Sequence, residues 1–247
     1  MKNRLILLFF SASLFIGSGA VSSEPIKKNR QYYEERKDII WEVKTDQKLI
    51  ALTFDDGPDP EETIEILDEL KKYNAKCTFF VIGKRVVEYP DVAKRVVAEG
   101  HELANHTYNH VYFKKSSLLS EVIQELHQTE TEIMKITGFK STLFRPPGGI
   151  YNDNVILAAK KLGLMPVLWS WHQDTRDWSK PGVNAIANKV LKNARNGDIV
   201  LMHDQVHGHS QTVQALKKIL PELTKRGFRV VTVTELINSD GAREVGK

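Results

Sequence analysis

Short apolar runs alternate with longer amphipathic segments along most of this chain. Six amphipathic segments of helix length lie at residues 60–73, 85–99, 120–137, 151–162, 183–196 and 211–226. A glycine follows several of them, as beyond many helix ends. The apolar runs of strand type lie at residues 49–54, 77–82, 102–104, 142–144, 166–170, 198–202 and 229–233. Seven strands alternating with six helices predict an α/β fold whose parallel sheet is covered by helices, either a closed barrel or an open doubly wound sheet.

One further run of strand type precedes this alternation. Residues 39–45 are separated from the run at 49–54 by a polar turn that contains Asp46 and Gln47. Two such runs joined by a short polar turn are typical of a β-hairpin. We therefore expect a short N-terminal β-hairpin that leads into the first strand of the sheet.

The first 22 residues have the three-part pattern of a secretory signal peptide. Two basic residues precede an apolar run at residues 5–17, and small residues follow it. The pattern predicts export, with cleavage after Ala20 or Ser22. The apolar run is shorter than the ~20 residues that a spanning helix needs, which favours a signal peptide over the alternative, an uncleaved signal anchor.

The rest of the chain divides by composition. Residues 23–38 are polar and charged and are predicted to be a linker, residues 39–237 form the folded domain, and residues 238–247 are a polar tail. A chain of 247 residues with 41% hydrophobic residues suffices for one α/β domain. The single cysteine, Cys77, excludes an intramolecular disulfide framework, and a net charge of +4 is too small to indicate a nucleic-acid partner. We expect a secreted or wall-associated monomer with no membrane span after signal cleavage.

Polar side chains follow five of the predicted strands. The carboxyl ends of parallel strands meet at one edge of the sheet, so we expect these side chains to form one site. They are Asp55 and Asp56, His106 and His110, Arg145, then Asp174, Asp177 and Trp178, and finally His203. The two adjacent aspartates stand where a nucleotide-binding fold carries a glycine-rich loop, which disfavours dinucleotide binding.

Two histidines and one aspartate suggest a metal site. His106 and His110 are four residues apart, and one helical turn would place both imidazoles on the same side. One carboxylate from Asp55 and Asp56 completes a set of three ligands with open coordination positions, which is typical of catalytic sites. Because the side chains of adjacent aspartates diverge, the second carboxylate is left to accept a proton from a water molecule.

Five short motifs contain or adjoin these residues. They are TFDDGP at residues 53–58, HTYNH at 106–110, RPPG at 145–148, DTRDW at 174–178 and LMHD at 201–204. The set resembles the motifs of the polysaccharide deacetylases of carbohydrate esterase family 4, the NodB-homology proteins, in the order of that family. The resemblance implies a distorted (β/α) barrel with fewer than eight units, which fits the seven predicted strands. It also implies a hydrolase that removes N-acetyl groups, or sometimes O-acetyl groups, from a polysaccharide.

The resemblance implies a role for each motif residue. Asp55 matches the catalytic base and His203 the general acid. The other matches are Asp56, His106 and His110 as metal ligands, Arg145 and Asp177 as the partners that orient the base and the acid, Trp178 and Leu201 as walls of the acetate pocket, and Asp174 in a supporting position. A backbone N–H near Gly148 matches the donor to the oxyanion. Many family members carry an aromatic residue at the position of Gly148, so the wall of the sugar subsite differs here.

The favoured substrate is N-acetylglucosamine of peptidoglycan, because an exported single domain meets the cell wall first. Chitin oligomers, acetylated xylan and N-acetylmuramic acid are the alternatives within the family. One divalent cation is implied, with Zn²⁺ the default for two nitrogen ligands and one oxygen, and Co²⁺, Ni²⁺ or Mn²⁺ also suited. A two-carboxylate glycosidase would leave both histidines without a role. A non-catalytic glycan-binding module would be expected to have lost one of the motif residues, and none is lost.

Overall fold

The computed structural model describes residues 28–208 and 210–240. In these ranges seven strands form one parallel sheet in the order β5-β4-β3-β2-β1-β6, and β7 pairs with β1. The strands are β1 (Leu49–Asp55), β2 (Thr78–Val81), β3 (Glu102–Asn105), β4 (Leu143–Phe144), β5 (Met165–Pro166), β6 (Asp198–His203) and β7 (Arg229–Val230). Each overlaps a predicted apolar run, so the predicted parallel α/β fold is confirmed.

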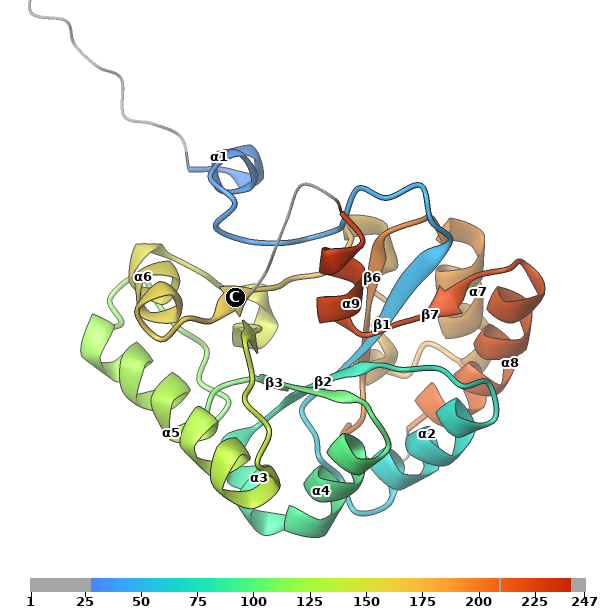
Figure 1. Cartoon of the computed structure of the whole chain (residues 1–247), viewed down its shortest axis with the longest axis horizontal. Helices are drawn as coiled ribbons and strands as arrows, with labels where there is room; N and C mark the ends of the chain where they lie inside the picture. The colour runs from blue at the N-terminus through green and yellow to red at the C-terminus, as the bar shows by residue number, and fades with distance from the viewer. Residues whose placement is uncertain (1–27, 209, 241–247) are drawn as a thin grey trace, which may run out of the picture.

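Helices surround the strands on the outside of the sheet (Figure 1). They are α2 (Glu62–Lys71), α3 (Gly83–Glu88), α4 (Pro90–Ala98), α5 (Leu119–Thr137), α6 (Asp153–Lys161), α7 (Val183–Asn193) and α8 (Thr212–Lys225), with the short 3₁₀ helices η1 (Pro147–Gly149), η2 (Trp171–Gln173) and η3 (Asp177–Ser179) in the loops. The one helix predicted over residues 85–99 is in fact two. Pro90 stands at the start of α4, where its missing N–H is not needed, and the preceding helix ends before it.

The two faces of β1 enter different parts of the core. Ile50, Leu52 and Phe54 pack outward against the surrounding helices, whereas Leu49 and Ala51 pack into an inner cluster. Side chains alternate along a strand, so the last residue of β1, Asp55, also points inward. The alternation therefore brings a carboxylate to the mouth of the barrel, next to the inner apolar cluster.

A short helix, α9 (Val233–Asn238), closes the other end of the barrel. Leu236 packs into the inner cluster, and the hydroxyl of Thr234 donates to the carboxylate of Glu102, the first residue of β3. The segment predicted as a strand over residues 229–233 therefore forms a strand only at Arg229–Val230, and its last residue, Val233, begins α9. The predicted polar tail begins with the last residue of α9, and residues 241–247 lie outside the described residues.

The predicted N-terminal hairpin is not formed. Residues 39–45 do not pair with β1, because β2, β6 and β7 occupy its edges. Instead Ile40 bridges Val167 beyond β5, and Glu42 bridges Asp198 at the start of β6. The segment thus lies between the two outer strands, whose unpaired backbone groups it satisfies. The pairing with these distant strands is therefore preferred to the local hairpin. It connects β5 to β6 and so closes the sheet into a distorted barrel.

The folded part of the chain begins earlier than predicted. Within the predicted linker at residues 23–38, a helix α1 (Arg30–Glu35) starts at Asn29, whose side chain accepts a hydrogen bond from the N–H of Tyr32. Tyr33 of this helix is buried and packs edge-on against Tyr151, with ring centroids 5.1 Å apart. The predicted signal peptide lies outside the described residues. Among the described helices, none has the length and apolarity needed to cross a membrane.

The seam made by residues 39–45 provides a test of the fold. Gly197 has φ of +82°, and a Cβ atom there would lie 1.7 Å from the carbonyl oxygen of Val43. We expect Gly197→Ala to lower the free energy of unfolding by about 3 kcal/mol or more, measured by urea denaturation. The matched control is Gly163→Ala, which has φ of +69° but open space around the new methyl group. This control should lower the free energy of unfolding by only about 1 kcal/mol. Equal losses for both variants would contradict the close packing of residues 39–45 against Gly197.

Candidate active site

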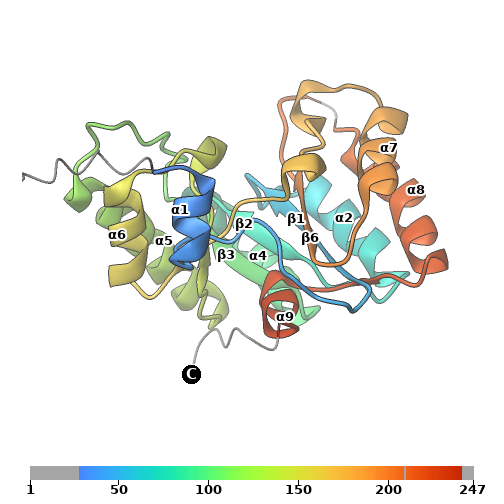
Figure 2. The ribbon, with the colours of Figure 1, turned by 90° about the horizontal axis from the view of Figure 1, so that it is seen from above.

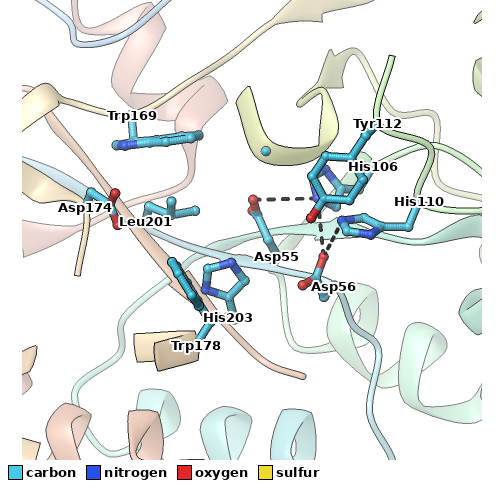
Figure 3. Close-up of a pocket in the computed structure, with 11 residues that line it drawn as sticks. Asp55, Asp56, His106, His110, Tyr112, Trp169, Asp174, Trp178, Leu201 and His203 are labelled. Atoms are coloured by element: carbon cyan, nitrogen blue, oxygen red, sulfur yellow. Dashed lines mark ion pairs between the residues drawn. The ribbon is translucent and has the colours of Figure 1, made fainter. Parts of the chain in front are cut away.

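The predicted site residues come together at the carboxyl ends of the strands (Figure 3). They line a pocket of about 380 Å³. The predicted residues on its wall are Asp55, Asp56, His106, His110, Gly148, Asp174, Trp178, Leu201 and His203. Arg145 and Asp177 are buried behind the wall. Arg145 holds Asp55 and Asp177 holds His203 by hydrogen bonds. The topology of the sheet therefore gathers all eleven predicted side chains and backbone groups at one place.

Asp55 is held by a fully buried arginine. Nη1 of Arg145 donates to Oδ1 of Asp55 at 2.6 Å and to the hydroxyl of Thr53 at 2.8 Å, and Nη2 donates to the carbonyl of Leu168 at 3.0 Å. The guanidinium carbon lies 3.9 Å from the ring centre of Phe80. Burial lowers the pKa of Arg145, and the charge of Asp55 opposes this shift. The arginine fixes one carboxylate oxygen of Asp55 and leaves the other free.

Three potential metal ligands lie together on one side of the pocket (Figure 3). Oδ1 of Asp56 lies 3.1 Å from Nε2 of His110 and 3.4 Å from Nε2 of His106. Burial raises the pKa of Asp56, but the two imidazoles outweigh this effect and lower the pKa below its ordinary value. The carboxylate is therefore ionised at neutral pH, as a metal ligand must be.

The two histidines converge through a loop and not through the predicted helical turn. Residues 106–110 are not helical, and Thr107 and His110 have φ of +65° and +56°. The carboxylate of Glu125 on α5 holds the loop, since it accepts hydrogen bonds from the backbone N–H groups of Tyr108 and Asn109 at 3.0 and 2.8 Å. The prediction of proximity holds, but the geometry depends on a side chain distant in the sequence.

The hydrogen bonds of this cluster fit a bound cation. Nδ1 of His106 lies 2.7 Å from the carbonyl oxygen of Arg145, which can only accept, so Nδ1 carries the hydrogen. This leaves Nε2 of His106 as the nitrogen that faces Asp56, whose Oδ1 is buried without a hydrogen-bond partner among the described residues. A buried carboxylate oxygen with two imidazole nitrogens facing it needs a positive charge between them, which a metal cation supplies. Asp56, His106 and His110 can therefore hold a divalent metal ion.

His203 and Asp177 form a hydrogen-bonded pair on the opposite side of the pocket. Nδ1 of His203 lies 2.7 Å from Oδ1 of Asp177, whose Oδ2 accepts from the backbone N–H of His203 at 2.8 Å and from the hydroxyl of Thr212 at 2.7 Å. Burial alone would lower the pKa of His203, but the hydrogen bond and the charge of Asp177 outweigh it and raise the pKa to about 9. The imidazole is therefore protonated at neutral pH.

The chain is similar to known proteins in sequence and in fold. Residues 42–167 match the family model of the polysaccharide deacetylases. The chain belongs to the polysaccharide deacetylase family. It is 52% identical over 202 residues to a peptidoglycan-N-acetylglucosamine deacetylase of Bacillus cereus, covering 81% of this chain and 92% of that protein.

Two solved structures show the same fold. The crystal structure of a peptidoglycan N-acetylglucosamine deacetylase in complex with a benzamide has a TM-score of 0.77 and 36% identity, covering 83% of this chain and 94% of that one. A family 4 acetyl xylan esterase from Clostridium thermocellum, in complex with a cobalt ion, has a TM-score of 0.72 and 34% identity, covering 78% and 92%. The barrel of this deacetylase is thus that of the family.

The pocket of the deacetylase has two aromatic walls that the motifs did not predict, Tyr112 and Trp169. A Cβ atom at Gly148 would lie 2.8 Å from the ring of Tyr112, so this ring occupies the space beside the glycine. It also packs edge-on against His110, with ring centroids 5.1 Å apart. Tyr112 therefore supplies an aromatic wall where Gly148 has no side chain. The available signal was an aromatic residue two positions after a predicted metal ligand.

A second group of metal-ligand type, Glu42, His172 and Asp198, lies at the opposite end of β6 from His203. Its carboxylates already have partners. His172 Nε2 lies 2.9 Å from Oδ1 of Asp198, and Glu42 forms an ion pair with Arg30 at 3.1 Å. These contacts fix the seam between the N-terminal segment and β6.

Proposed function

We propose that this deacetylase hydrolyses the N-acetyl group of N-acetylglucosamine in peptidoglycan, with one divalent cation held by Asp56, His106 and His110. The observation that carries the proposal is the convergence of three ligands, a fixed carboxylate and a protonated imidazole on one pocket. The similarity to a peptidoglycan deacetylase over most of both chains supports the substrate. Zn²⁺ is the cation we assign to two imidazoles and one carboxylate.

The cation, when bound, supplies Lewis acidity that polarises the acetamide carbonyl and makes a water molecule acidic. We assign to Asp55 the role of base. Its Oδ1 is held by Arg145, whereas Oδ2 lies 3.8 Å from Nε2 of His106 and so faces the cluster of ligands. Oδ2 is thus the oxygen that accepts the proton of the attacking water.

We assign to His203 the role of acid. Its Nδ1 is taken by Asp177, which leaves Nε2–H for the nitrogen of the departing sugar amine. An amine is a poor leaving group until it is protonated, so a protonated imidazole meets the need. The N–H of Gly148 is our donor to the oxyanion, and Trp178 and Leu201 enclose the acetyl methyl group. Asp174, which accepts from the N–H of Arg176 at 3.0 Å, supports this wall.

The test is acetate release from purified peptidoglycan and from chitin oligomers by the mature enzyme, with and without a chelator. We expect release from peptidoglycan that the chelator abolishes and added Zn²⁺ restores. Release from chitin oligomers alone would overturn the proposed substrate. Release that is indifferent to the chelator would overturn the metal-dependent chemistry.

The pKa of His203 leads to a prediction about pH. The raised pKa, about 9 against an ordinary value of about 6.5, comes from Asp177. In the folded enzyme the acid form then persists to about pH 9, and the stabilisation from this pair is complete below about pH 6.5 and lost as pH rises to about 9. We expect Asp177→Asn to move the alkaline limb of the kcat/KM profile from about pH 9 toward about pH 6.5. An unshifted limb would show that Asp177 does not set the protonation of His203.

We also infer that the protein acts outside the cell after removal of its signal peptide. The basic start, the apolar run and the small residues that follow support this reading. N-terminal sequencing of the protein from the culture medium of an expressing bacterium tests it. We expect the mature chain to begin directly after Ala20 or Ser22.

A further inference from the structure

A groove of about 870 Å³ adjoins the catalytic pocket and takes no part in the chemistry above. The two cavities share Gly148, Trp169 and Asp174 on their walls. A polymer bound with one sugar in the pocket therefore passes into the groove without leaving the protein surface. The substrate of a polysaccharide deacetylase is such a polymer, so the groove is placed to contact the sugars that flank the reacting one.

The residues that line this groove come from two separate parts of the fold. Trp41 and Tyr151 pack edge-on against each other near α1 and α6, whereas Trp171 belongs to η2 and Lys189 to α7. Figure 2 shows the ribbons of α1 and α6 well separated from α7. Trp171 is 86% exposed, the most exposed large apolar side chain of the described residues. An indole left open beside a binding pocket offers a flat apolar face of the kind on which the C–H face of a sugar ring stacks.

The charges in the groove are mainly positive. Lys189 forms no ion pair with the carboxylates of the described residues, and the mostly exposed guanidinium of Arg176 lies 3.9 Å from Asp174. The third cation, Arg30, is already paired with acidic side chains of the N-terminal segment. Arg176 is thus held by Asp174 only at long distance, and Lys189 has no carboxylate partner among the described residues, so the groove has excess positive charge and favours a ligand that carries negative charge.

We propose that this groove is a subsite for a sugar next to the one deacetylated, with Trp171 stacked on its ring and Lys189 and Arg176 bound to a carboxylate that it carries. The inference rests on the proposed function and deepens it. In peptidoglycan the alternate sugars bear lactyl or peptide carboxylates, whereas the sugars of chitin are neutral. The groove therefore selects an anionic glycan over a neutral one, while the catalytic pocket treats the acetamido group of both alike.

The experiment compares two substrates of equal sugar length. They are a peptidoglycan tetrasaccharide with its stem carboxylates and the tetramer of N-acetylglucosamine, and the readouts are kcat and KM for acetate release. We expect Trp171→Ala to raise KM about tenfold on both substrates with kcat unchanged, because the stacking is indifferent to charge. We expect Lys189→Glu to raise KM about fivefold on the peptidoglycan fragment alone, and the difference to vanish in about 0.5 M salt.

Two matched variants control for unrelated effects. Lys192→Glu makes the same charge reversal three residues further along α7, outside the groove, and should change neither KM. Met134→Ala removes another exposed apolar side chain, on α5, that lines neither cavity, and should also be neutral. These controls show whether a change in KM depends on the groove.

The possible failures are distinguishable. If the wild-type enzyme deacetylates both substrates but Lys189→Glu alters both KM values equally or neither, the carboxylate subsite is wrong and the proposed function stands. If Trp171→Ala leaves KM unchanged on both, the stacking platform is wrong. If the wild-type enzyme releases acetate from neither substrate, the proposed function fails and the subsite with it.

Discussion

Replacement of Asp55 by Asn should lower the rate of acetate release by about 10²- to 10⁴-fold, the usual contribution of a general base. The amide oxygen can still accept the hydrogen bond from Nη1 of Arg145, now 2.6 Å from the carboxylate, so the side chain keeps its place. It cannot take a proton from water. The measurement is acetate release from peptidoglycan, with the metal content of the same sample determined in parallel.

The metal content separates loss of chemistry from loss of the site. Asp56, His106 and His110 are untouched, so the variant should bind one equivalent of Zn²⁺ as the wild type does. The matched control is Asp68→Asn, the same change at an exposed carboxylate on α2. A variant at Asp55 that binds Zn²⁺ and retains the wild-type rate would remove the base from the mechanism.

The second large effect concerns stability. Arg145→Met should lower the free energy of unfolding by about 3–5 kcal/mol, the usual result of breaking one half of a buried ion pair. The change leaves Asp55, which is 4% exposed, without its cation, and it leaves the carbonyls of Val167 and Leu168 without their donors. Urea denaturation at pH 7 measures the loss.

The double variant Asp55→Leu/Arg145→Met distinguishes the lost pair from simple misfit. Because it removes both charges, it should recover part of the stability that Arg145→Met loses, although it remains inactive. A double variant no more stable than the single one would show that the cost lies in packing around Phe80 and not in the unpaired carboxylate.

Much of the fold was predictable because it depends on local patterns. Each strand overlaps an apolar run, and each of the helices from α2 to α8 overlaps an amphipathic segment. The parallel topology then brings the polar residues after β1, β3, β4 and β6 to one end. Spacing and polarity in the sequence thus sufficed to assemble the site.

The failures occurred where long-range contacts overrule local patterns. Residues 39–45 pair with the ends of β5 and β6 because those edges are open, which no local turn signal reveals. The loop with the two histidines takes its shape from Glu125, fifteen residues or more away. Tyr112 reaches the wall of the pocket only because Gly148, in another motif, leaves room for its ring. Such contacts join segments that the sequence alone does not pair.

The most direct test of the central claim is the position of the metal ion. Anomalous diffraction at the zinc absorption edge, from crystals of the enzyme grown with Zn²⁺, locates it independently of activity. We expect one strong peak about 2.0–2.2 Å from a carboxylate oxygen of Asp56 and from Nε2 of both His106 and His110. A pocket without such a peak, with zinc only at Glu42, His172 and Asp198 or nowhere, would contradict the proposed metal site and the hydrolysis that depends on it.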